Sequence, residues 1–280
     1  MIYFIIAIAL SASIYLLFKY VGAKQHHLAT VVLFNYIVCV AIGCFGLLFK
    51  ESSVVIDSKL VQSTSVMGLL FISMFYLMGL LTNKSGVAVS SIISRVSLVI
   101  PALFFYFVWG EKLSALAITG IFVAIASIVL VNKRRGQALK FNSALPFIVF
   151  VGYGVVDVGL KLSQHHVQES GAVQHELTLG IFLFAGIYGW LIKFIKKIPL
   201  QKESIAIGLV LGLVNYFSIY FFFLALEQID LAVTVIFPIN GISIMLLATV
   251  LSSLLFRETI SANKIVALVL AVISIVLLSN

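Results

Sequence analysis

One arginine stands inside a long apolar stretch of the chain, and this position gives it the clearest chemical potential. Arg95 lies in the stretch 87–108, where serines occupy positions 90, 91, 94 and 97. A charged residue at the centre of a membrane helix costs about 2.5–3.5 kcal/mol on insertion scales, so its presence there indicates a function. A guanidinium binds carboxylates and phosphates through paired hydrogen bonds. We therefore predict that Arg95 binds an anionic group of a substrate, in a segment with an unusually polar lining.

Two acidic residues in other apolar stretches could complement this arginine. Asp157 lies in the stretch 144–162, four residues after Tyr153 and so on the same face of a helix. Glu176 lies near the start of a further stretch. Either carboxylate could hold an amine of the substrate or take up a coupling proton. The alternatives are a structural ion pair with Arg95 and, for Glu176, stabilisation of a helix N-terminus.

Uncharged polar residues near the middle of several apolar stretches could line a polar pathway. The alternative is that asparagines and tyrosines hydrogen-bond between helices as packing contacts. A proline frees a backbone carbonyl one turn earlier, so Pro238 could kink its helix beside Asn240. The substrate-binding candidates of this kind are Asn35, Tyr76, Asn215, Tyr220 and Asn240, and Tyr36 and Tyr216 stand next to two of them.

The histidines and cysteines do not indicate a resident metal or a disulfide. The two groups of histidines fall in connections that the topology below puts on opposite sides of the membrane, although three of them could still bind a metal locally. Cys39 and Cys44 are five residues apart and face different sides of one helix, which argues against a disulfide. We predict no metal site and no cofactor. The histidines are His26 and His27 in one group and His165, His166 and His175 in the other.

The amino-acid composition is too apolar for a water-soluble protein and indicates a membrane protein. Of the 280 residues, 62% are hydrophobic and only 10% are charged, too few to cover a soluble fold. About 20 apolar residues cross the hydrocarbon core as a helix. We predict an all-α integral membrane protein in which the first stretch is a retained span. The ten predicted spans are 2–20, 28–49, 65–82, 87–108, 114–132, 144–162, 171–193, 203–225, 231–255 and 261–279.

The distribution of lysine and arginine predicts how these spans are oriented. The odd-numbered connections hold 13 of these residues and the even-numbered ones hold 4, which with Arg95 accounts for all 18. Positive charge in short loops is retained in the cytoplasm. We predict a multi-pass protein of the plasma (inner) membrane with cytoplasmic odd connections and both termini outside. The net charge of +8 then sets topology and does not indicate nucleic-acid binding.

The second half of the chain repeats landmarks of the first half. Ala88-Val89-Ser90 corresponds to Ala232-Val233-Thr234, and Glu111 corresponds to Glu258. Each half has five spans, an odd number, so the two copies must insert in opposite orientations. We predict inverted repeats over 1–136 and 137–280. The two glutamates precede the last helix of each half, where a carboxylate favours the helix N-terminus, and Ser114 and Ser261 are the expected N-caps.

The run from Tyr220 to Ser261 resembles the C-terminal signature of EamA-type carriers, a family of the drug/metabolite transporter superfamily. The matching features are an aromatic-rich span, a short acidic turn, a small-residue span interrupted by Pro238, and Glu258 before the last helix. The resemblance implies ten helices around a central cavity and transport of small polar or amphipathic metabolites without ATP. The first half departs from it with Ser94 in place of the proline, and the family commonly keeps both termini in the cytoplasm.

These observations together favour a secondary transporter over other membrane proteins. We predict alternating access for an amino-acid-like or drug-like metabolite, with the bilayer and a small-molecule substrate as partners, no nucleic acid, and a monomer or homodimer. A lipid-carrier flippase on the same fold is one alternative. An integral membrane enzyme acting on lipid-linked substrates is another, but such enzymes need acid or histidine clusters at one membrane face. We therefore predict that the chain is not an enzyme.

Overall fold

The computed structural model of the chain describes residues 1–47, 57–110, 114–132, 144–170, 174–228, 233–258 and 260–278. Within these ranges all regular structure is helical. The helices are α1 (Ile2–Ala23), α2 (Leu28–Leu47), α3 (Ser58–Ser85), α4 (Val87–Val96), α5 (Val99–Trp109), α6 (Ala115–Asn132), α7 (Leu145–Ser170), α8 (Gln174–Ile195), α9 (Lys202–Gln228), α10 (Val233–Phe256) and α11 (Ala262–Leu278).

The helices confirm the predicted multi-pass membrane architecture. Eight segments are long and apolar enough to cross a bilayer, and two shorter apolar helices, Ala115–Val131 and Ala262–Leu278, occupy the fifth and tenth predicted spans. The fourth predicted span is divided into α4 and α5. The third helix begins at Ser58, earlier than the predicted 65, because residues 58–64 are too polar to register as a span but contain no helix breaker.

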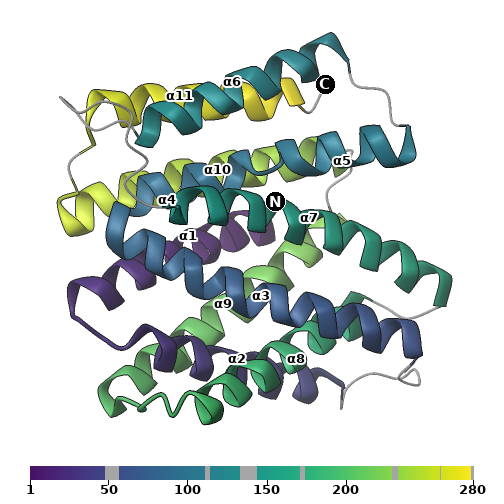
Figure 1. Cartoon of the computed structure of the whole chain (residues 1–280), viewed down its shortest axis with the longest axis vertical. Coiled ribbons are helices and arrows are strands. Elements are labelled where there is room, and N and C mark those ends of the chain that lie inside the picture. Colours follow the sequence, from purple (N-terminus) through teal and green to yellow (C-terminus); the bar gives the residue numbers. More distant parts are fainter. Residues whose placement is uncertain are drawn as a thin grey trace.

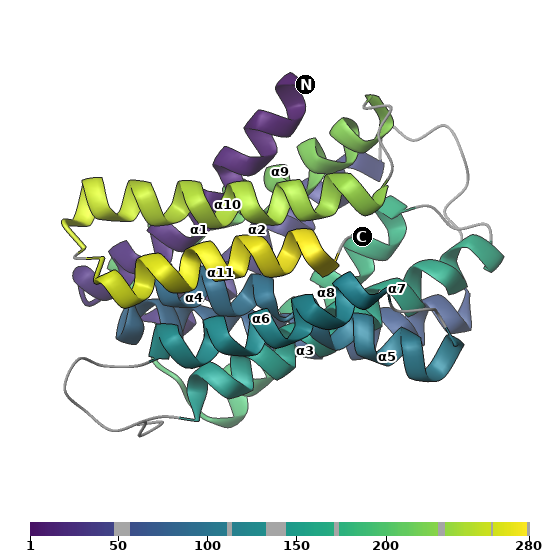
Figure 2. The ribbon, with the colours of Figure 1, turned by 90° about the horizontal axis from the view of Figure 1, so that it is seen from above.

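The two halves of the chain interleave in space. At one end of the molecule α6 lies along α11, and at the other end α2 and α8 lie beside α9 and α3 (Figure 1). Seen from above, α10, α11 and α6 run side by side (Figure 2). Helices of both halves contribute to each of the two large buried clusters. The core therefore forms between the halves and not within each one.

The helix pairs follow the order that two repeats would produce. In the predicted repeat, α8 is the second-half copy of α2, and α9 is the copy of α3. In the structure each helix packs on the copy of its neighbour: α2 on α9, and α3 on α8. Likewise α1 packs on α10, while its counterpart α7 packs on α4 and α5. The predicted boundary between the halves, at 136 and 137, lies outside the described residues. The division into repeats remains a prediction that this pairing favours.

A pair of glycines brings α9 close to α2. A Cβ added at Gly208 would lie 2.7 Å from the carbonyl oxygen of Val31, and one added at Gly212 would lie 2.6 Å from that of Asn35. Both distances are shorter than real Cβ contacts. The Gly-xxx-Gly pattern therefore serves packing within the chain. The thiol of Cys39 donates to the Gly212 carbonyl at 3.5 Å, and both cysteines are free.

The predicted helix caps are confirmed. Ser114 Oγ accepts from the Ala117 N–H at 3.0 Å, and Ser261 Oγ accepts from the Lys264 N–H at 3.4 Å. A hydroxyl in this position satisfies one of the free donors at the start of a helix. These serines begin α6 and α11, the two helices that pack against each other. Glu258, in contrast, binds the N-terminus of a different helix from the one expected, as described below.

Candidate functional site

The most enclosed helix of the bundle is α4, a half-length helix that ends inside its span. Every residue of α4 except Arg95 is buried. Pro101 has no N–H to donate to the carbonyl of Ser97, which accepts from Ile100 instead at 2.9 Å. The helix ends at Val96, and α5 continues after a turn at Ser97 and Leu98. The arginine thus lies in the last turn of a broken helix.

The serines of α4 do not form the polar lining that their number predicts. Each donates its hydroxyl hydrogen to a carbonyl in the preceding turn, for example Ser91 to Ala88 at 3.2 Å and Ser97 to Ser94 at 2.8 Å. Such back-bonding satisfies the hydroxyl inside its own helix. The small side chains therefore allow close packing of α4 and supply few free polar groups. Ser94 also bonds the hydroxyl of Tyr15 in α1, at 2.7 Å.

Unlike the serine hydroxyls around it, the side chain of Arg95 has a buried polar atom without a hydrogen-bond partner. Its Nε is buried without a hydrogen-bond partner, and the described residues offer its side chain neither a hydrogen bond nor an ion pair. Its Cδ lies 3.5 Å from the position that a Cβ would take on Gly241 in α10. In the neighbouring residue Asn240, Oδ1 is also buried without a partner. A free donor and a free acceptor thus belong to adjoining parts of α4 and α10.

The acid and tyrosine predicted on one face of α7 both approach this region. Asp157 lies close enough to Arg95 for their charges to interact, and Tyr153 lies near both. Among the described residues, however, no carboxylate forms an ion pair with the guanidinium within 4.0 Å. The Tyr153 hydroxyl lies 2.8 Å from Met78 Sδ in α3. The structural ion pair considered for Arg95 is therefore not formed, although an acid is near.

Other sequence candidates make contacts with residues other than the arginine. Glu176 is buried in the first turn of α8, where it takes part in an interaction of its own. Asn215 donates from Nδ2 to Asn35 Oδ1 at 3.2 Å, joining α9 to α2. The packing alternative thus describes this pair well. Tyr220 is 45% exposed on α9 and contacts the rings of its aromatic neighbours.

Tyr76 lines a separate surface pocket of about 740 Å³. The pocket lies between α3 and the connections that precede α2 and α9, and His26, His27 and Lys202 also line it. Arg95 and the other predicted pathway residues are not part of the lining of this pocket. Within the described part of the chain, no three histidine, cysteine or acidic side chains are grouped to hold a metal. The side chains of His165 and His166 lie outside the described set.

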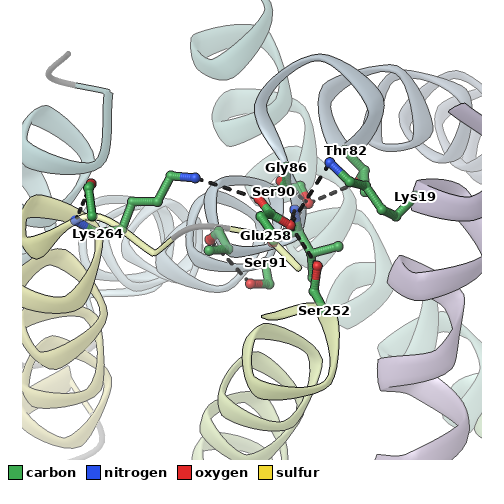
Figure 3. Close-up of polar contacts among 11 residues, drawn as sticks. Lys19, Thr82, Gly86, Ser90, Ser91, Ser252, Glu258 and Lys264 are labelled. Carbon is green, nitrogen blue, oxygen red and sulfur yellow. Dashed lines mark hydrogen bonds and ion pairs between the residues drawn. The ribbon is translucent and has the colours of Figure 1, made fainter. Parts of the chain in front are cut away.

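A second polar centre, which we call the Glu258 cluster, joins the halves at the start of α4 (Figure 3). Glu258 Oε2 accepts from the backbone N–H of Val87 at 3.2 Å and from the hydroxyl of Ser252 at 2.6 Å. Lys264 Nζ lies 3.5 Å from Oε1, and Lys19 Nζ lies 4.0 Å from Oε2. The expected stabilisation of a helix N-terminus by Glu258 is real, but the helix is α4 of the other half and not α11.

Gly86 makes this arrangement possible. Its backbone has φ +95° and ψ 167°, a conformation that is accessible essentially only to glycine. A Cβ at this position would overlap the Glu258 carboxylate. The hydroxyls of Thr82 and Ser90 bond to each other at 2.8 Å across the same turn. Sequence reasoning missed this site, although a lone glycine between two apolar stretches was an available signal.

The fold and these sites define a polytopic, all-helical integral membrane protein with a broken helix in its centre. Residues 145–280 match the model of the EamA-like transporter family. This match confirms the resemblance seen in the sequence. The chain is also 28% identical over 266 residues to an uncharacterized protein of Haemophilus influenzae (strain ATCC 51907 / DSM 11121 / KW20 / Rd), covering 92% of this chain and 90% of that one.

A solved crystal structure has the same fold. It superposes with a TM-score of 0.65 at 16% sequence identity, over 99% of this chain and 94% of the other. Similarity at this level of identity concerns the arrangement of the helices alone. The whole chain, and not only residues 145–280, therefore has a helix arrangement that is found in a solved structure.

Proposed function

We propose that this protein is a secondary transporter that moves a small polar or amphipathic metabolite by alternating access. Arg95 holds an anionic group of the substrate, and Asn240 and Asp157 face the remaining polar part, such as an amine. The protein resides in the inner membrane with its odd-numbered connections in the cytoplasm, where the bias of 13 basic residues against 4 favours them. Residues 145–280, which match the model of a transporter family, support this class of function.

The observation that carries the proposal is the Nε atom of Arg95, which is buried without a hydrogen-bond partner. Inside a membrane protein, a charged group normally pairs with another residue or marks the path of a substrate or ion. Arg95 Nε has no partner, and Asn240 Oδ1 is left without a donor. A substrate with a carboxylate and an ammonium would satisfy both groups at once. An amino-acid-like metabolite has this chemistry.

The break in the fourth span supports a transport mechanism. Transporters commonly place their substrate sites at discontinuous helices near the middle of the bilayer, where unwound backbone and side chains are available. Here α4 ends at Val96 and α5 begins at Val99, directly after the arginine. The turn allows the two segments to tilt independently. This gives a hinge beside the proposed binding residue.

The test is a thermal-shift assay on purified protein with matched probes. L-phenylalanine, L-phenylalaninamide and phenethylamine share a ring and an amine, but only the first has a carboxylate, and L-threonine, L-glutamate and L-lysine extend the range of side chains. We expect at least one free amino acid to stabilise the wild type, its amide not to do so, and Arg95→Ala to abolish the shift. Equal stabilisation of Arg95→Ala by the same amino acid would contradict the assigned role.

A further inference from the structure

The Glu258 cluster connects parts of the chain that the proposed transport cycle must move relative to each other. Its residues come from the end of α1, the start of α4, the end of α10 and the start of α11. All of these ends lie at odd-numbered connections. The cluster therefore lies at one face of the molecule, and it ties the first half to the second there.

Both oxygens of the carboxylate at the centre of the cluster have polar partners. Only 10% of the Glu258 side chain is exposed, and its two oxygens face one backbone N–H, one hydroxyl and two ammonium groups. Charge-assisted bonds of this kind are about twice as strong as neutral ones. Of the titratable groups in the described residues, Lys19 and Lys264 face the Glu258 carboxylate. Without Glu258, two partly buried lysines from different halves would face each other without an anion.

The same carboxylate holds the N-terminus of α4, the helix that carries Arg95 in its last turn. From Val87 to Arg95, α4 spans about 12 Å at a helical rise of 1.5 Å per residue. One end of this helix is held by Glu258, and the other end meets the turn at Ser97 and Leu98. A displacement at Val87 must therefore tilt α4 and shift the guanidinium. Glu258 is a positioning residue for Arg95, since it contacts the start of the helix that carries the arginine and not the arginine itself.

We propose that Glu258 is the latch that holds the odd-connection face closed and fixes Arg95 in this conformation. Opening toward that face requires the bond to the Val87 N–H and the bridge between Lys19 and Lys264 to break. This inference rests on the proposed alternating access for its biological meaning. The latch itself can be tested without any substrate.

The test measures the accessibility of the arginine region from each face. Cys39 and Cys44 are replaced by alanine, and Gly241→Cys provides a reporter beside Arg95, where a Cβ meets nothing closer than 3.5 Å. Lys196→Cys in the exposed turn before α9 marks the odd-connection face in a parallel sample. Reconstituted vesicles are labelled with a charged, membrane-impermeant maleimide. The marker shows which vesicle orientation presents that face.

We expect Glu258→Ala to raise the rate of reporter labelling from the odd-connection face by about fivefold or more, the range that the loss of one or two strong contacts produces. Labelling from the other face should not rise. Glu258→Gln keeps an acceptor for the Val87 N–H but loses both lysine pairs, so a smaller increase is expected. Glu203→Gln removes an exposed acid at the same face and is the matched control, with no change expected.

Unchanged labelling from the odd-connection face in both Glu258 variants would overturn the latch. A rise of equal size from both faces would also overturn it, since a merely loosened protein would behave in that way. If Glu258→Ala does not fold, Glu258→Gln carries the test. If labelling changes but no amino acid binds, the latch is supported and the proposed substrate is wrong. If an amino acid binds but labelling does not change, the proposed substrate is supported and the latch is wrong.

Discussion

The carboxylate of Glu258 accepts a hydrogen bond from the backbone N–H of Val87, 171 residues earlier in the chain, at 3.2 Å. This bond anchors the helix that carries Arg95 to the turn between α10 and α11. The first turn of a helix has free N–H groups and a partial positive charge, so an anion is stabilised there. An acidic residue of one half thereby determines the placement of a basic residue of the other.

Gly86 should be intolerant of even the smallest side chain. In Gly86→Ala the Cβ would overlap the Glu258 carboxylate, and the backbone conformation alone costs about 1–3 kcal/mol for a residue with a Cβ. We expect a loss of at least this size in the free energy of unfolding, measured by thermal or denaturant unfolding in detergent. Gly110→Ala is the control. It also has positive φ, but nothing lies within 4 Å, so it should lose only about 1 kcal/mol. Equal losses in the two variants would contradict the proposed contact.

The Asn35–Asn215 pair should behave as a packing contact. Asn215→Leu removes the donor to Asn35 Oδ1 and leaves a fully buried amide without that partner, so we expect a loss of about 1 kcal/mol in stability. The double variant Asn35→Leu/Asn215→Leu should recover part of this loss, because both polar groups are then gone. Unfolding of the three variants measures the effect. A double variant that is less stable than the single one would show that Asn35 has another role.

Close approach of α9 to α2 should make Gly212 irreplaceable. The Cβ of Gly212→Ala would lie 2.6 Å from a backbone oxygen of α2, so the two helices must separate, at a cost of about 1–3 kcal/mol. Gly186→Ala in α8 is the matched control, since its nearest neighbour atom would be 3.7 Å away. It should be neutral or stabilising by up to about 1 kcal/mol, because alanine favours the helix. Comparable unfolding temperatures for the two variants would argue against tight α2–α9 packing.

The predicted orientation can be tested with cysteines in exposed positions at the two ends of the bundle. Lys196→Cys precedes α9, and Lys59→Cys lies in the first turn of α3. In intact cells, an impermeant maleimide should label Lys59→Cys but label Lys196→Cys only after the membrane is permeabilised. This follows from cytoplasmic retention of the basic connections. The reverse pattern would place both termini in the cytoplasm, as is usual in the family that the chain resembles.

Some features of the site could be predicted because they depend on short segments. Ser114 and Ser261 were expected as N-caps and do cap their helices, since capping involves residues three apart. The break of the fourth span could have been predicted as well, because Pro101 removes the donor for Ser97 whatever surrounds it. The four serines misled the prediction, since their hydroxyls bond within α4 and do not line a pathway.

The sequence by itself determined that the chain crosses a membrane about ten times, because each helix must satisfy its own backbone and match the bilayer independently of the others. It also singled out Arg95, since a charge in an apolar stretch is visible without any structure. Only the tertiary structure decided which polar groups meet. Arg95 Nε and Asn240 Oδ1 are buried without partners, Tyr76 lines a surface pocket, and Glu258 binds α4. These outcomes depend on how each helix is rotated and on contacts between distant segments, which packing sets and local sequence does not.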